Sequence, residues 1–135
     1  VDAIDVPDPT DLAISGNLRA MAVTNFASNT VTIIDIDPGS PTFHTVLKTV
    51  PVGGGPRGCA FHSENEDLFV ANFLGNSISV IRQLDFEPRK VITNQINRPI
   101  DVAVTPRQIN FGFNTGLYFA YFLNQSGNIA VMESG

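Results

Sequence analysis

Two acidic and two basic residues have the types and positions to bind a ligand: Asp11, Arg57, Arg98 and Asp101. Each lies in a polar segment that leads into a short apolar run. An arginine guanidinium binds carboxylates and phosphates through paired N–H groups, and carboxylate oxygens are the preferred ligands of hard cations. The sequence therefore predicts a site for a small polar or anionic ligand held by Arg57 and Arg98, or for a cation held by Asp11 and Asp101. The alternative is structural, with these groups pairing with one another and with the backbone of turns.

Other catalytic and metal-binding patterns are missing from the sequence. Its two histidines, His44 and His62, belong to no H-E-x-x-H motif, and there is no C-x-x-C-H or G-x-S-x-G motif. Asp35 and Asp37 are followed by a Pro-Gly pair, which indicates a turn and not a calcium loop. The single cysteine, Cys59, lies in an apolar run and is expected to be a buried structural thiol. We expect no metal and no cofactor, and we favour a protein that is not an enzyme.

The segments that position these residues are short apolar runs joined by tight turns. Residues 56–61, 68–73 and 77–81 form three such runs in succession. The same pattern occurs 47 residues earlier, at Pro9, and in altered form 43 residues later, at Pro99. This gives repeats at residues 9–55, 56–98 and 99–135, with residues 1–6 predicted as the last strand of a preceding unit. The fourth strand of the second repeat is predicted at residues 90–96.

A repeat of this length, built from short strands, predicts a β-propeller. The strands are apolar on both faces, as expected for sheets that stack face to face. A small residue recurs in the first strand of each repeat, at Ala13, Ala60 and Ala103, as expected for a crowded strand near the axis. The fold class is therefore all-β, a partial propeller of about three four-stranded antiparallel blades. A small sandwich or barrel is the alternative, because short strands also permit it.

Two segments resemble the core of the YVTN family of propeller repeats. They are Ala22-Val23-Thr24-Asn25 and Phe69-Val70-Ala71-Asn72, and in the third repeat Tyr118-Phe119-Ala120-Tyr121 corresponds to them, with Tyr121 in place of the asparagine. The resemblance implies a propeller of the kind usually found outside the cytoplasm, hence a periplasmic, secreted or cell-surface location. Related propellers occur in lactonases and in redox proteins, so the resemblance does not imply one reaction.

The number of repeats predicts partners. Propellers typically close with about 4–8 blades, and this chain supplies about three, so the remaining blades come from a longer polypeptide or from identical chains. A further protein partner is predicted at Phe111 and Phe113, in the longer loop of the third repeat, unless these aromatic residues fill an interface to the next blade. The net charge of −5 argues against nucleic acid, and no apolar run reaches the roughly 20 residues of a membrane span.

From these observations we expect a non-catalytic scaffold or binding module in a larger extracytoplasmic or surface protein. The alternative is a segment of a propeller enzyme, a lactonase-like hydrolase or an oxidoreductase subunit, whose main catalytic residues lie outside this chain. In that case Arg57, Arg98 or Asp101 would contribute to its site.

Overall fold

The computed structural model describes residues 1–64, 67–108 and 116–134. This part of the chain forms eleven β-strands and no helix, and so contains no helix that would cross a membrane. The strands are β1 (Pro9–Ile14), β2 (Ala20–Asn25), β3 (Thr30–Asp35), β4 (Val46–Pro51), β5 (Pro56–Phe61), β6 (Asp67–Asn72), β7 (Ser77–Arg82), β8 (Glu87–Ile92), β9 (Pro99–Val104), β10 (Phe119–Asn124) and β11 (Ile129–Glu133).

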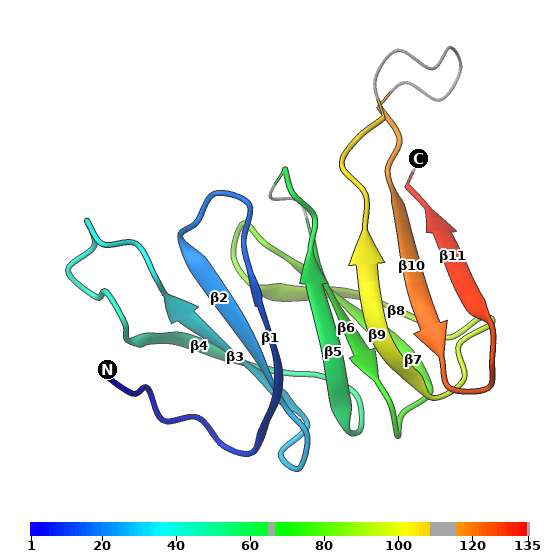
Figure 1. The fold of residues 1–135 in the computed structure, drawn as a ribbon, viewed down its shortest axis with the longest axis horizontal. Coiled ribbons are helices and arrows are strands. Elements are labelled where there is room, and N and C mark those ends of the chain that lie inside the picture. The colour runs from blue at the N-terminus through cyan, green and yellow to red at the C-terminus, as the bar shows by residue number, and fades with distance from the viewer. Residues whose placement is uncertain (65–66, 109–115, 135) are drawn as a thin grey trace.

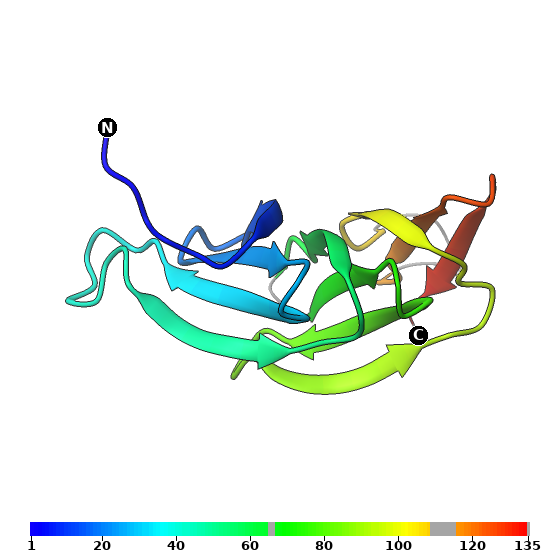
Figure 2. The same cartoon turned by 90° about the horizontal axis from the view of Figure 1, so that it is seen from below.

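The strands form three antiparallel sheets, which we call blades 1, 2 and 3. Blade 1 has the order β1-β2-β3-β4, blade 2 the order β5-β6-β7-β8, and blade 3 the order β9-β10-β11 among the described residues. The first strands β1, β5 and β9 lie side by side (Figure 1), and the fourth strands β4 and β8 lie along the opposite side of the molecule (Figure 2). This arrangement confirms the predicted fold class, an all-β partial propeller.

The core lies between the blades and not within one sheet. One face of blade 2, including Leu68 and Val70, packs with Ala22, Val31 and Ile33 of blade 1. The opposite face packs on blade 3, with Phe69, Ala71, Ile78 and Val80 of blade 2 against Ile96, Val102, Tyr118, Ala120 and Phe122. Four successive residues of β6, at positions 68–71, are therefore 0% exposed. This double burial explains why the strand is continuously apolar and does not alternate.

An asparagine ends the second strand of every blade, and it reveals an error in the predicted third repeat. Pro9 pairs with Asn25, Pro56 with Asn72, and Pro99 with Asn124. The residues that match the YVTN-like segments are therefore positions 121–124, Tyr-Phe-Leu-Asn, and the proposed match at 118–121 was wrong by three residues. The cause is the longer connection between β9 and β10, which displaces the rest of the repeat.

Two other predictions concern strand boundaries. The fourth strand of blade 2 was expected at residues 90–96 but runs from Glu87 to Ile92, because its charged first half carries no apolar signal. Residues 1–6 form no strand in this structure. A strand at residues 1–6 would pair with strands of a preceding blade. That these residues are the last strand of a preceding blade therefore stays a prediction.

Candidate functional site at the start of the first strands

Three of the four predicted ligand-binding residues lie close together where the first strands begin. Asp11, Gly58 and Asp101 occupy the same level of β1, β5 and β9, and a Cβ built on Gly58 would lie only 2.8 Å from the Asp101 Cα. A cavity of about 420 Å³ is present here; its lining residues are Thr10, Asp11, Arg57, Ile100, Asp101 and Leu123. The structure thus brings Asp11, Arg57 and Asp101 together, while Arg98 lies outside this lining.

Both carboxylates of the site also bond to backbone amides. Asp11 Oδ2 accepts a hydrogen bond from the Cys59 N–H at 3.1 Å, which links blade 1 to blade 2. Asp101 Oδ1 accepts one from the N–H of the next residue, Val102, at 2.8 Å. Each carboxylate therefore has a structural role at one of its oxygens, in agreement with part of the structural alternative.

The two arginines meet at an aromatic ring that sequence reasoning did not single out. The guanidinium carbons of Arg57 and Arg98 lie 4.9 Å and 5.5 Å from the centre of the Phe73 ring. Such cation–π contacts orient a guanidinium without neutralising its charge. Within residues 1–64, 67–108 and 116–134, neither arginine forms an ion pair. The signal for Phe73 was the Asn-Phe pair formed by the last residue of β6 and the residue after it, which also occurs at residues 25–26.

Cys59 lies beneath this site and is not a reactive nucleophile. It is 5% exposed, and burial raises the pKa of its thiol strongly, with a further rise from the negative charges of Asp11 and Asp101. Because the thiolate is the nucleophilic form of cysteine, the thiol stays protonated near neutral pH. This confirms that Cys59 is a buried thiol.

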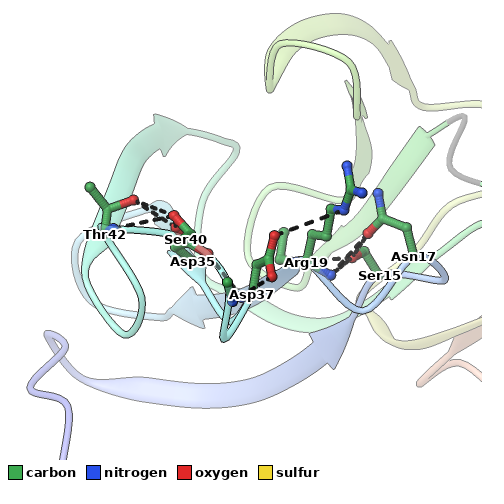
Figure 3. A network of polar contacts seen from close by, with 9 residues as sticks. Ser15, Asn17, Arg19, Asp35, Asp37, Ser40 and Thr42 are labelled. Carbon is green, nitrogen blue, oxygen red and sulfur yellow. Dashed lines mark hydrogen bonds and ion pairs between the residues drawn. The ribbon is translucent and has the colours of Figure 1, made fainter.

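In the Asp35–Asp37 turn, the Asp35 carboxylate accepts hydrogen bonds from neighbouring groups of the protein (Figure 3). Asp35 Oδ2 accepts hydrogen bonds from Ser40 Oγ at 2.5 Å and from Thr42 Oγ1 at 2.6 Å, and its Oδ1 accepts one from the Asp37 N–H at 2.9 Å. These bonds, with that of Ser40 the largest contribution, hold the pKa of Asp35 below its usual value. Asp37 in turn lies 4.0 Å from Arg19. The turn is therefore a self-contained polar network.

The two histidines lie in separate environments. His62 directly follows β5, is fully buried and stacks on the Tyr118 ring with centroids 4.0 Å apart, whereas His44 stacks on Phe43 at 3.6 Å. Asp67, at the start of β6, accepts hydrogen bonds from the Tyr118 hydroxyl and from an arginine of β8. In the part of the chain that the structure describes, no three potential ligands group into a metal site. The predicted partner-binding residues Phe111 and Phe113 lie outside the described residues.

Comparison with known proteins supports the fold. No protein-family model and no curated protein matches the sequence. Among solved structures, the chain is similar to hydrazine synthase of Kuenenia stuttgartiensis, with a TM-score of 0.79 and 21% identity over 97% of this chain and 34% of that one. It is also similar to the WD40 repeats of RRP9, with a TM-score of 0.70 and 14% identity over 89% of this chain and 32% of that one.

A third similar structure is a functionally unknown protein from Desulfotomaculum acetoxidans, with a TM-score of 0.69 and 22% identity over 98% of this chain and 44% of that one. The chain thus spans less than half the length of each of these three proteins. At these identities the similarity concerns the fold, and together with the three stacked sheets it shows that the chain consists of β-propeller blades.

Proposed function

We propose that this chain is a non-catalytic segment of a β-propeller, which acts as a rigid scaffold and binds a small anionic ligand beside Phe73. The observation that carries the proposal is the pair of arginines, Arg57 and Arg98, stacked on one ring and free of ion pairs within the described residues. Guanidinium groups fixed in this way keep their N–H edges available for a carboxylate or phosphate. Its resemblance to YVTN repeats supports an extracytoplasmic or surface location.

The arginine pair is a departure from the repeat and not part of it. The residue of blade 1 that corresponds to Phe73 is Phe26, and the positions of Arg57 and Arg98 correspond there to Thr10 and Gly55. Blade 1 therefore folds in the same way without either guanidinium. A feature that one blade carries and its neighbour lacks is not required by the propeller, which supports a role in binding.

The neighbouring carboxylates refine the kind of ligand. Asp101 is exposed, and its Oδ1 accepts the hydrogen bond from the Val102 N–H, so its other carboxylate oxygen can accept a hydrogen bond from a ligand. An oxyanion alone would be repelled by this charge, whereas a ligand that also carries hydroxyl or ammonium donors would gain a hydrogen bond from it. We therefore propose a polar molecule that combines a carboxylate or phosphate with hydrogen-bond donors.

The scaffold role rests on the outer face of blade 3. Its exposed apolar residues are Tyr121, Leu123, Ile129 and Val131, and they occupy the positions of Phe69, Ala71, Ile78 and Val80 of blade 2. All four residues of blade 2 are at most 1% exposed because blade 3 covers them. We propose that further blades cover the outer face of blade 3 in the same way, so that the chain is part of a larger propeller.

The ligand proposal is tested by titrating the protein with inorganic phosphate and with citrate, which also carries a hydroxyl group, by isothermal calorimetry. Citrate should bind more tightly than phosphate, and replacing either arginine by glutamine should weaken its binding by about tenfold, because a charge-assisted hydrogen bond is lost. Arg19→Gln is the matched control, since Arg19 is exposed at the opposite end of blade 1. No binding of either probe, or equal losses in the Arg19 variant, would overturn the proposal.

A further inference from the structure

Three residues share an unusual backbone conformation just before the first strands. Asp8, Gly55 and Arg98 each precede the proline that begins β1, β5 or β9, and their φ angles are 39°, 58° and 46°. Glycine takes a positive φ at no steric cost and aspartate at a small one, whereas an arginine is strained there. A following proline restricts the residue further, toward extended conformations. Arg98 therefore occupies a position of the repeat that suits a glycine.

This backbone conformation decides where the side chain points. A Cβ built on Gly55 would lie 2.9 Å from Cε2 of Phe26, the residue that follows β2. At Arg98 the same conformation directs the side chain to Phe73, the equivalent of Phe26, and the Arg98 guanidinium carbon lies 5.5 Å from the centre of that ring. An extended backbone at this position would turn the Cβ away from the ring.

The Arg98 side chain makes no polar contact that would offset the strain. Asp8 differs, because its carboxylate accepts a hydrogen bond from the Ala27 N–H at 3.0 Å. Within the part of the chain that the structure describes, the Arg98 guanidinium forms neither a hydrogen bond nor an ion pair, and its contact with Phe73 is a cation–π contact. Strain that is kept without a structural return is typical of binding sites.

An asparagine side chain holds Arg98 in this conformation. Asn76 Oδ1, in the turn between β6 and β7, accepts a hydrogen bond from the Arg98 N–H at 2.9 Å. The Arg98 carbonyl in turn accepts one from the Gln125 N–H at 3.0 Å. Blade 1 has an equivalent anchor, since Asn29 Oδ1 accepts the Gly55 N–H at 2.9 Å. Both asparagines anchor the residue before a proline, but only Asn76 anchors one that carries a charge.

The neighbouring turn leaves room for the arginine. A Cβ built on Gly55 would also lie 2.7 Å from Leu74 Cγ, so the interface of blades 1 and 2 is closed to a side chain there. Leu74 is the second residue of the β6–β7 turn, and the second residue of the β10–β11 turn is Ser126, which is smaller and exposed. Glycine thus faces leucine at one interface, whereas arginine has serine as its counterpart at the other.

We propose that Asn76 is a positioning residue of the anion site: its bond to the Arg98 N–H keeps Arg98 in the left-handed conformation that aims the guanidinium at Phe73 and at the ligand. This role rests on the anion-binding function proposed above and adds how one of its two arginines is held. Such preorganisation saves the entropy of ordering the side chain when a ligand binds. Without the bond, the strained backbone relaxes toward an extended conformation and the guanidinium leaves the ring.

The test compares Asn76→Gly with Asn29→Gly by citrate titration and by thermal melting. Glycine keeps the positive φ of the two asparagines, 49° and 56°, and removes only the side-chain acceptor. Both variants should melt about 2–5 °C below the parent, as for the loss of one exposed hydrogen bond. Citrate binding should weaken about five- to tenfold in Asn76→Gly, close to Arg98→Gln, and at most about twofold in Asn29→Gly, because Gly55 needs no anchor and carries no charge.

An NMR measurement separates positioning from stability. The Arg98 side-chain protons of the parent should be shifted upfield by the ring current of Phe73, since the guanidinium lies over that ring. This shift should disappear in Asn76→Gly and persist in Asn76→Asp, whose carboxylate keeps the acceptor. Asn29→Gly should leave it unchanged.

The possible outcomes distinguish the positioning role from the anion site itself. Equal citrate binding by the parent and Asn76→Gly, or an unchanged ring-current shift in that variant, would overturn the positioning role and leave the anion site in place. Equal losses of binding in the two glycine variants would do the same, because the effect would then be one of stability. If the parent binds neither citrate nor phosphate, the anion site is wrong and the positioning role falls with it.

Discussion

Substitution of Gly58 by alanine tests how closely the first strands approach one another. The new Cβ would lie 2.8 Å from both the Asp101 Cα and the Ile100 carbonyl oxygen. These are backbone atoms that cannot rotate away, so β5 and β9 would have to separate. In an isolated strand, alanine would be more stable than glycine by about 0.5–1 kcal/mol. Overpacking of this kind costs about 1–3 kcal/mol, so the blade contact should reverse the sign and leave a net destabilisation of about 1–2 kcal/mol.

The effect of the Gly58 substitution is measured by urea unfolding and by thermal melting. For a chain of this size the melting temperature should fall by about 3–8 °C. Gly39→Ala is the matched control, because Gly39 lies in a loop and its nearest contact would be a side-chain oxygen at 3.4 Å. That variant should keep the stability of the parent or gain slightly. Unchanged or increased stability of Gly58→Ala would refute the close approach of β5 and β9.

Three further predictions concern buried and hydrogen-bonded groups. Cys59 should react with a disulfide reagent far more slowly in the native protein than in urea, because burial raises its pKa; equal rates would contradict this. Asp35→Asn should be less stable than the parent above about pH 5, and the difference in stability should shrink as the pH falls through the lowered pKa of Asp35. Urea unfolding at several pH values measures this difference, and a difference independent of pH would refute the prediction. Asn72→Ala should cost about 1–3 kcal/mol in urea unfolding, since the buried Asn72 amide donates to Ser77 at 3.1 Å and Ser79 at 2.8 Å; a loss below about 0.5 kcal/mol would exclude that role.

The sequence predicted the blades well where the repeat is regular. Blades 1 and 2 share an offset of 47 residues, and the proline and asparagine that mark them are paired across the first two strands of each blade, Pro9 with Asn25 and Pro56 with Asn72. Blade 3 was misaligned because insertions change the spacing but not the pairing. Only the strand register shows that Asn124, which pairs with Pro99, is the asparagine of blade 3 that corresponds to Asn25 and Asn72.

The candidate site was predicted in part, for a physical reason. Asp11 and Asp101 stand at equivalent positions of their repeats, and equivalent positions fall at equivalent heights, so the structure places both carboxylates at one level. The role of Phe73 depends on the meeting of Arg57, in β5, with Arg98, which directly precedes β9. Such a meeting depends on the spacing between blades, and the periodicity of one sequence does not specify it.

The most direct test of the stacked-blade arrangement is a proton–proton NOE experiment between neighbouring first strands. Gly58 and Asp101 lie in different sheets and are 43 residues apart in sequence, yet their backbones are in contact. The stacked arrangement of the blades predicts NOE cross-peaks between the α-protons of Gly58 and the protons of Asp101. Cross-peaks restricted to strand pairs within each sheet would contradict it.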